Sequence, residues 1–260
     1  MRHTANHQSG FTLIELAIVL TILGLLTTGI LAGRTMVRQA QLRGVMSEIE
    51  RYKTASLTFL NQFNSIPGDM QTAFTYWGRD CVNSGDAVTD AQRCNGNGNR
   101  VFDPDTTGTP LGTESESFRY WQHLVLAELI PGPFTGQGNG TSGLQGDIGI
   151  NVPASSLGSG NNVYTVETLN YAAGGTDPHI VLGAAATDAL PKTSTLTPRE
   201  LSSLDEKVDD SMPNTGTLGG ENGTNTIAEG FICINGSAAT DAYNLTERNA
   251  TCTAWFRMLP

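Results

Sequence analysis

The sequence predicts an α+β protein in which one long N-terminal helix packs on an antiparallel β-sheet head. Two observations carry this prediction. An apolar run at residues 11–33 is followed, with no intervening proline, by apolar side chains at helical spacing as far as residue 63. Later segments are rich in β-branched and aromatic residues and are bounded by Gly, Asn and Pro, which is typical of strands. A helical part followed by a strand-rich part indicates the α+β class.

The apolar run at 11–33 carries one charged residue, Glu15. About 20 apolar residues in a helix span a bilayer, so the run is long enough to be transmembrane. A cleaved secretory signal is the alternative, but such signals have a shorter apolar core of about 7–15 residues. An ionisable group inside a membrane helix is costly, which makes Glu15 a candidate functional residue.

A short polar leader, residues 1–10, ends in Gly10 and is followed by Phe11, Thr12, Leu13, Ile14 and Glu15. This segment closely resembles the cleavage and methylation signature of the type IV prepilin family. The resemblance implies that a prepilin peptidase cuts between Gly10 and Phe11 and that the new Phe11 amine is methylated. It also implies a single-pass inner-membrane precursor that later joins a periplasmic or cell-surface filament.

In that family, the carboxylate at the position of Glu15 is thought to neutralise the terminal amine of a neighbouring subunit. Such a pairing is physically reasonable because a buried unpaired charge costs several kcal/mol. The alternative is that Glu15 pairs with the Phe11 amine of its own chain, four residues back on the same helical face. Both pairings can hold at different stages of assembly.

The chain divides into the leader at 1–10, a long helix at 11–64 whose residues 11–33 are transmembrane, and a globular α+β head at 65–260. We expect one side of the helix to carry an apolar stripe on the head, formed by Val45, Ile49, Tyr52, Ser56, Phe59 and Phe63 with Ala55 and Leu60 beside it. The opposite side carries Glu48, Glu50, Arg51 and Lys53. The segment 64–68, which contains Pro67 and Gly68, ends the helix. Many pilins carry a proline around the position of Ala32, and this sequence does not.

The flanking charges disagree with an extracytoplasmic head. Arg34, Arg38 and Arg43 follow the apolar run, whereas Arg2 and the terminal amine precede it. The positive-inside rule therefore favours a cytoplasmic head. We give more weight to the leader motif and to the cysteines, because the rule is a statistical bias.

The head is acidic, with 9 Lys and Arg against 22 Asp and Glu over residues 65–260. This charge is a poor match for phosphate backbones, so we predict no direct nucleic-acid partner. The four cysteines all lie in the head, which suits an oxidising compartment. Three pairings are possible; we favour Cys81 with Cys94 and Cys233 with Cys252, which close short loops. The second pair resembles the C-terminal disulfide loop of many pilins.

Residues 69–112 are the most irregular stretch and alternate Asn with Gly at 95–99. Oxygen ligands at every second position suit calcium, although Arg100 and Thr106 exclude an EF-hand loop. A looser calcium site is possible, with candidate ligands Asp86, Asn95, Asn97, Asn99, Asp103 and Asp105. The alternative is a simple array of Asn-Gly turns. Calcium is the one cofactor that the sequence suggests.

Two further helices are expected. One follows a capping-box pattern at 113–116 and ends at Pro131, and the other runs from Pro198 to about Val208 after a second capping box at 197–200. We expect strands at 148–152, 163–172, 179–185, 230–234 and 251–258. A G-x-G-x-x-G match at 138–143 lacks the preceding strand that nucleotide binding requires.

The sequence contains no G-x-S-x-G, no H-E-x-x-H and no Walker A loop, so we do not predict an enzyme. The predicted function is a structural subunit of a type IV pilus-like filament, which polymerises with other pilins through its N-terminal helix and uses an inner-membrane assembly machinery. The alternative within the class is a pseudopilin of a type II secretion system. The alternative from another class is a monomeric membrane-anchored extracytoplasmic binding protein.

Overall fold

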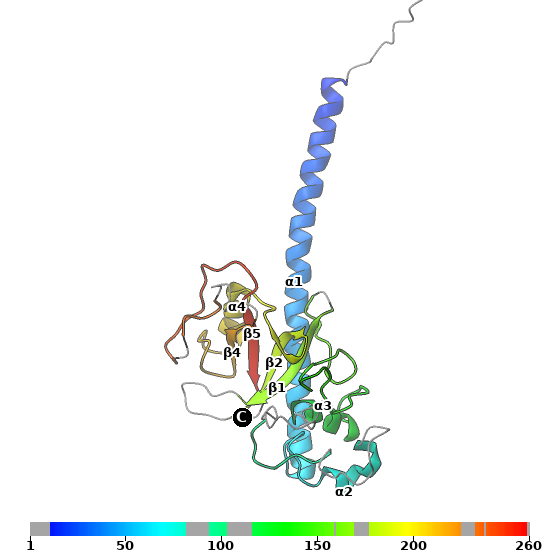
Figure 1. Cartoon of the computed structure of the whole chain (residues 1–260). Helices are drawn as coiled ribbons and strands as arrows, with labels where there is room; N and C mark the ends of the chain where they lie inside the picture. The colour runs from blue at the N-terminus through cyan, green and yellow to red at the C-terminus, as the bar shows by residue number, and fades with distance from the viewer. Residues whose placement is uncertain are drawn as a thin grey trace, which may run out of the picture.

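The computed structural model describes residues 11–81, 94–102, 116–158, 160–168, 177–224, 232–236 and 238–258. Its dominant element is helix α1 (Leu13–Phe63), which is 51 residues and about 77 Å long. The N-terminal half of α1 stands clear of the rest of the molecule, and its C-terminal half lies along a compact body (Figure 1). Every residue from 11 to 37 is exposed. We call residues 11–37 the stem, and the body together with the rest of α1 the head.

The buried face of α1 is the apolar stripe that the sequence predicted. Its fully buried members include Val45, Ile49 and Phe59, and the stripe extends one turn further back, to Leu42. The ring of Phe63 is half-buried and lies 4.5 Å from that of Phe59, centroid to centroid. The helix ends as expected, at Asn64, which adopts the left-handed conformation and donates its N–H to the Leu60 carbonyl.

One residue of α1 contradicts the sequence interpretation. We expected Glu48 on the solvent side, but its carboxylate lies against the head. Glu48 Oε2 accepts hydrogen bonds from the Tyr164 hydroxyl at 2.6 Å and from the Ser156 N–H at 3.2 Å. Position 48 is three residues after Val45 and four before Tyr52, so helical geometry puts it on the edge of the buried stripe. The interpretation was wrong because it assigned the side by polarity instead of by spacing.

The head contains a five-stranded antiparallel sheet, which confirms the predicted fold class. Its strands are β1 (Asn162–Thr168), β2 (Pro178–Ala186), β3 (Ala189–Thr193), β4 (Leu218–Asn222) and β5 (Cys252–Arg257). The order is β1-β2-β5-β4, and β3 pairs with the C-terminal end of β2. One face of the sheet belongs to the same core as the stripe of α1, as in the ring contact of Tyr52 with Tyr164 at 5.4 Å.

Several strand predictions were wrong. Residues 148–152 form an isolated bridge between Ile148 and Val152, and Ile234 forms another with Tyr243, so neither segment is a strand as far as it is described. Strands β3 and β4 were not predicted. The sequence of β4 begins Leu-Gly-Gly, with low strand propensity, because Trp255 and Leu201 fill the space that side chains at Gly219 and Gly220 would need.

Helix α3 (Glu116–Leu126) packs against both α1 and β1. The first three residues of its expected capping box lie outside the described residues. It ends before Pro131, contrary to the prediction. The Leu129 N–H bonds to the Leu124 carbonyl and the Glu128 N–H to the Val125 carbonyl, which is a Schellman motif. Glu128 takes the left-handed position, with φ 58°, where glycine is usual. No glycine therefore marked this end in the sequence.

The remaining helices lie at opposite parts of the head. Helix α4 (Pro198–Val208) confirms the prediction: Thr197 and Glu200 form the expected capping box, and Pro198 opens the helix. Helix α2 (Ala73–Trp77) and the 3-10 turn η1 (Gly78–Cys81) fall in the stretch that the sequence indicated to be irregular. α2 lies at the end of the head that is furthest from the stem (Figure 1).

A buried histidine joins α3 to the loop after α1. His123 Nδ1 accepts the N–H of Gly68 at 2.9 Å, so its Nε2 carries the proton and donates to the Cys94 carbonyl at 2.9 Å. Burial lowers the pKa of His123 to about 4, and the ring is neutral at pH 7. The ring also lies 6.1 Å from that of Phe59, nearly parallel to it.

Two disulfides cross the head. Cys81 is joined to Cys94, with a Cα separation of 5.4 Å, and Cys233 to Cys252, with a Cα separation of 5.0 Å. Cys252 is the first residue of β5, and Asn222 of β4 accepts the Cys233 N–H at 2.6 Å through its side-chain oxygen. The second disulfide therefore attaches the segment before β5 to the β4–β5 edge of the sheet.

Candidate functional site

The start of α1 is organised around Thr12 and Glu15. Thr12 is the N-cap, with extended backbone angles of φ −78° and ψ 152°. The Thr12 hydroxyl accepts the Glu15 N–H at 3.3 Å, and Glu15 Oε2 accepts the Thr12 N–H at 2.8 Å. The Thr12 hydroxyl donates its own proton to Glu15 Oε2, also at 2.8 Å. This reciprocal arrangement is a capping box, so the carboxylate that the sequence singled out also caps its own helix.

The sequence contained the signal for this cap. Residues 12–15 read Thr-Leu-Ile-Glu, which is the T-x-x-E pattern, but our interpretation considered only the charge of Glu15. Within the described residues, Glu15 Oε1 has no hydrogen bond. Phe11 lies outside the helix and is 84% exposed, and Gly10 lies outside the described residues. In the uncut chain the Phe11 nitrogen belongs to a peptide bond, so both amine pairings of Glu15 stay predictions.

Between Glu15 and Arg34 the stem is apolar around its whole circumference. α1 is long and apolar enough to cross a membrane. Its exposed side chains include large aliphatic residues on every side: Leu13, Ile14, Leu16, Ile18, Val19, Leu20, Ile22, Leu23, Leu25, Leu26, Ile30 and Leu31. A helix that is hydrophobic all round is stable where lipid or other helices surround it. The stem is therefore the part of the described chain that needs an external partner.

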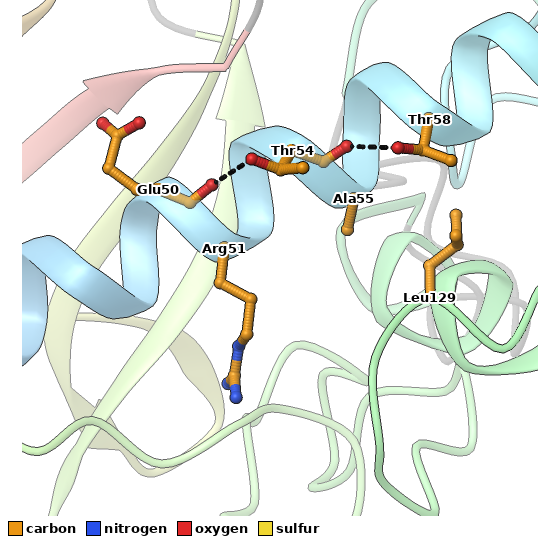
Figure 2. Close-up of a pocket in the computed structure, with 6 residues that line it drawn as sticks. All are labelled: Glu50, Arg51, Thr54, Ala55, Thr58 and Leu129. Atoms are coloured by element: carbon orange, nitrogen blue, oxygen red, sulfur yellow. Dashed lines mark hydrogen bonds between the residues drawn. The ribbon is translucent and has the colours of Figure 1, made fainter.

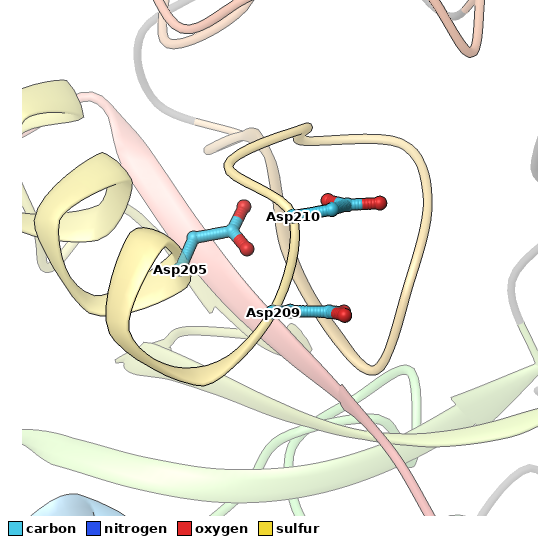
Figure 3. A group of neighbouring side chains, drawn as sticks. All are labelled: Asp205, Asp209 and Asp210. Atoms are coloured by element: carbon cyan, nitrogen blue, oxygen red, sulfur yellow. The ribbon is translucent and has the colours of Figure 1, made fainter.

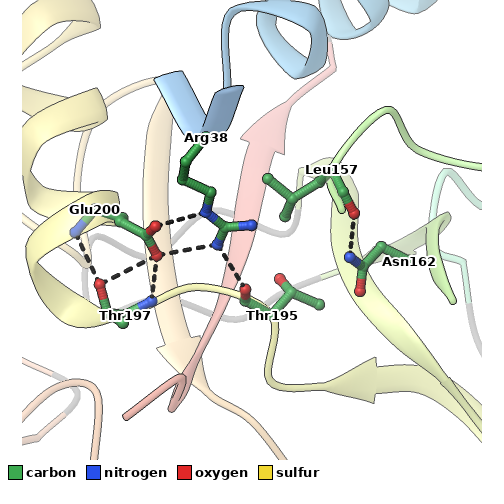
Figure 4. A network of polar contacts seen from close by, with 6 residues as sticks. All are labelled: Arg38, Leu157, Asn162, Thr195, Thr197 and Glu200. Carbon is green, nitrogen blue, oxygen red and sulfur yellow. Dashed lines mark hydrogen bonds and ion pairs between the residues drawn. The ribbon is translucent and has the colours of Figure 1, made fainter. Parts of the chain in front are cut away.

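A polar network joins α1, at the first residue after the stem, to α4 and the residues before it (Figure 4). Arg38 donates to both carboxylate oxygens of Glu200, at 2.6 Å from Nε and 3.0 Å from Nη2, and Nη2 also donates to the Thr195 carbonyl at 3.2 Å. Glu200 is at the same time the third residue of the α4 capping box with Thr197. The hydrogen bonds from Arg38 and Thr197 hold the pKa of Glu200 below its usual value despite burial. Our interpretation of the sequence used Arg38 only as one of the charges that bear on membrane orientation.

The structure describes three of the six candidate calcium ligands. Asp86, Asp103 and Asp105 lie outside the described residues. Each of the three asparagines accepts a backbone N–H through its side-chain oxygen: Asn95 from Phe74, Asn97 from Asn99 and Asn99 from Val101. The last two contacts are those of Asn turns, as in the turn array that we gave as the alternative. Calcium binding stays a prediction, which thermal unfolding with calcium and with chelator can test.

Three carboxylates that the sequence analysis did not single out come together at the C-terminal end of α4. Asp205, Asp209 and Asp210 place oxygens within 4.8 Å of one another (Figure 3). Each has protein donors. Asp205 accepts from the Tyr243 hydroxyl at 2.7 Å, Asp210 from the Thr215 hydroxyl at 2.6 Å, and Asp209 from the Leu218 N–H at 3.3 Å. Burial raises the pKa of Asp205 to about 6. These hydrogen bonds explain why the three carboxylates lie together: they form the polar centre of a turn.

An open groove of about 450 Å³ lies between α1 and the segment that follows α3 (Figure 2). It is lined by Glu50, Arg51, Thr54, Ala55, Thr58 and Leu129. The hydroxyls of Thr54 and Thr58 each donate at 2.8 Å to the carbonyl one turn back, so they are already used by the helix. The groove thus lacks the converging polar groups that a catalytic site needs.

Comparison with known proteins supports the assignment of the N-terminus. Residues 5–31 match the family model described as the prokaryotic N-terminal methylation motif. This match confirms the type IV prepilin-type signature and supports a type IV pilin-like or pseudopilin-like precursor. Together with the apolar helix, it fits a precursor that is anchored in the inner membrane. The comparisons found no match among curated proteins and none among solved structures.

Proposed function

We propose that the chain is a structural subunit of a type IV pilus-like filament. A prepilin peptidase cuts it between Gly10 and Phe11, the Phe11 amine is methylated, and the stem polymerises with other pilins. The observation that carries this proposal is the fully exposed apolar stem, most of which lies within the methylation-motif match at residues 5–31, with one carboxylate, Glu15, in its first turn.

The stem has two successive surroundings in this proposal. It first spans the inner membrane as a single helix, with the disulfide-bonded head outside the cytoplasm. It then leaves the lipid and packs against the stems of neighbouring subunits. Gly24, Gly29 and Gly33 have no neighbouring atoms within 4 Å of where a side chain would start, so other helices can approach closely there.

Glu15 guides the packing by pairing with the Phe11 amine of a neighbouring subunit. The free amine arises only on cleavage, so the pair forms only between processed chains. Glu15 Oε2 is held by Thr12, and Oε1 is the oxygen left for the incoming amine. An ion pair between buried groups is strongly favoured over leaving either charge alone in the apolar core.

The same observations fit a pseudopilin of a type II secretion system, which is the alternative within the class. The domain division that we propose is the leader at 1–10, the helix at 11–64 and a globular α+β domain at 65–260. A monomeric membrane-anchored binding protein is the alternative from another class. It would be indifferent to Glu15, because a single membrane helix needs no charge pair between subunits.

The test is the variant Glu15→Gln in the native host. Gln at this position can still accept the Thr12 N–H, so the helix cap is retained and only the charge is removed. We expect normal cleavage and methylation, read by mass spectrometry of the mature N-terminus, together with a fall in filament yield of about tenfold or more. That fall corresponds to about 1.4 kcal/mol or more of lost pairing free energy.

The matched control is Glu50→Gln, which removes an exposed carboxylate from the head half of the same helix. We expect its filament yield to equal that of the native chain. Normal filament yield from Glu15→Gln would contradict the filament proposal. A mature chain that starts after Gly33 would contradict the processing step.

A further inference from the structure

The stem fixes the depth of the head relative to a membrane. The apolar run ends at Gly33, and Arg38 follows five residues later, which is about 7.5 Å along a helix. The headgroup layer on each side of a bilayer is about 5–8 Å thick. Arg38 holds Thr195 and Glu200 at its own level through three hydrogen bonds. With the stem across a bilayer, this end of the head therefore stands at the depth of the lipid headgroups.

Two segments form this end of the head. One is the first turn of α4, beside Glu200. The other is the segment at 243–251 before β5, which is attached to it: Arg199 Nε donates to the Leu245 carbonyl at 2.8 Å, and the Thr251 N–H to the Leu196 carbonyl at 3.0 Å. In Figure 1 the orange-to-red segment before β5 reaches further along the stem than any other described part of the head.

The exposed side chains of these segments have the character of a membrane-surface contact. Leu245 is 47% exposed, and Arg199 and Arg248 are exposed beside it. The one acid at 243–251, Glu247, is half-buried and turned onto its own loop, where Oε1 accepts the N–H groups of Arg248 and Asn249, each at 2.7 Å. This surface therefore differs in sign from the acidic head as a whole.

We propose that the surface formed by Arg199, Leu245 and Arg248 docks on anionic lipid headgroups of the membrane that the stem crosses. The two guanidinium groups bind lipid phosphates, and Leu245 inserts between the headgroups, as apolar side chains of interfacial segments do. Arg34 is exposed on the stem one turn before Arg38, about 6 Å nearer the hydrocarbon, and its long side chain adds a third cation that reaches toward the same headgroups. This inference rests on the proposed membrane-anchored precursor.

Docking fixes the orientation of the head relative to the membrane. The ion pair of Arg38 with Glu200 fixes α4 to α1 directly after the stem, and the lipid contact fixes α4 to the membrane. Together they hold the head upright against one side of the stem. Extraction of the subunit into a filament must break the lipid contact, because the stem leaves the bilayer and the surface leaves the headgroups with it.

The test uses the full-length uncut chain in two kinds of lipid nanodisc, one of phosphatidylcholine alone and one with a quarter of phosphatidylglycerol. Hydrogen exchange of the amides at 244–250 is followed by mass spectrometry. We expect exchange about fivefold slower in the anionic disc, and we expect this difference to disappear in high salt, because salt screens the contact between charged groups. Equal exchange in the two discs at low salt overturns the inference.

Arg248→Glu and Arg79→Glu form a matched pair of variants. Both residues are exposed, but Arg79 lies in η1, next to α2 at the far end of the head. We expect Arg248→Glu to lose the lipid-dependent protection and Arg79→Glu to keep it. Equal loss in both variants overturns the inference, because it indicates a response to total charge. If lipid charge has no effect on the uncut chain, but the chain isolated from the native host starts at methylated Phe11, the docking inference is wrong and the filament proposal stands. Failure to insert into either disc contradicts the membrane anchoring instead.

Discussion

The two halves of α1 form one continuous helix in two different surroundings. No residue of the stem is buried, whereas the head half buries seven residues, from Leu42 to Phe59. The stem is apolar on all sides, and the head half is apolar on one side only. Both halves are helical because the backbone bonds are local and no proline interrupts them. The distribution of side chains around the helix, rather than helicity, therefore decides what each half contacts.

The two halves of α1 contribute to different equilibria. The head half stabilises the fold of the isolated chain, because its stripe is removed from water by α3 and the sheet. The stem contributes nothing to that fold and gains its stabilisation only from lipid or from other subunits. Substitutions in the two halves should consequently change different measurements.

The largest expected effect separates the halves directly. Phe59→Ala removes a fully buried ring that packs on Phe63, Trp77 and His123, and should lower the free energy of unfolding of the head by about 3–5 kcal/mol. Leu20→Ala in the stem should leave it unchanged. Denaturant unfolding in detergent, followed by tryptophan fluorescence, measures both. Equal losses would show that the stem packs on the head.

The next effect concerns the pH dependence of the head half and its neighbours. His123 has a pKa of about 4 in the folded state, against about 6.5 when unfolded. Between pH 6.5 and pH 4 the unfolded chain binds a proton at His123 and the folded chain does not. The free energy of unfolding therefore falls as the pH falls from 6.5 to 4. The loss amounts to about 3 kcal/mol.

Two buried carboxylates act in the opposite direction. Burial raises the pKa of Glu167 to about 7 and that of Asp205 to about 6, so both add stability as the pH falls below 7. His123→Gln isolates the histidine, because these carboxylates are common to both chains. The difference in unfolding free energy between the native chain and the variant should shrink by about 3 kcal/mol from pH 7 to pH 4. A constant difference would contradict the neutral buried histidine.

The smallest effect lies at the boundary between the halves. Arg38→Gln breaks the ion pair with Glu200 and should cost the head about 1 kcal/mol, since the pair is only partly buried. Arg43→Gln, one turn further and exposed, is the control and should cost nothing measurable. A double-mutant cycle with Glu200→Gln gives the coupling of the pair, because Gln retains the helix cap of α4. No coupling would mean that other contacts hold α4 in place beside α1.

Local patterns predicted the elements whose signals are local. The spacing of apolar residues predicted α1 and its buried stripe, and the capping box at 197–200 predicted α4. The signals for β3, β4 and the end of α3 are not local. Strand β4 contains adjacent glycines because Trp255 and Leu201 need the space, and α3 ends in a Schellman motif without glycine. Such features depend on packing that propensity does not describe.

The polar contacts of the helix were missed for the same reason. Glu48 bonds to Tyr164, 116 residues away, and Arg38 to Glu200, 162 residues away. Nothing near either residue in the sequence indicates its partner. At the candidate site the situation is reversed: Glu15 was found from its motif, and its bond to Thr12 was overlooked although the two are three residues apart. The charge of Glu15 suggested an ion pair, and its simpler role as a hydrogen-bonding cap was therefore not predicted.

The cap formed by Thr12 and Glu15 also bears on how the leader is removed. Both capping residues lie after the proposed cleavage point, so the helix loses none of its end contacts when the leader is cut away. Phe11 and Thr12 are not helical, and the backbone of Thr12 is extended. A peptidase can therefore reach the bond before Phe11 without unwinding any of α1. The maturation step changes the chemistry of the first residue and leaves the helix behind it intact.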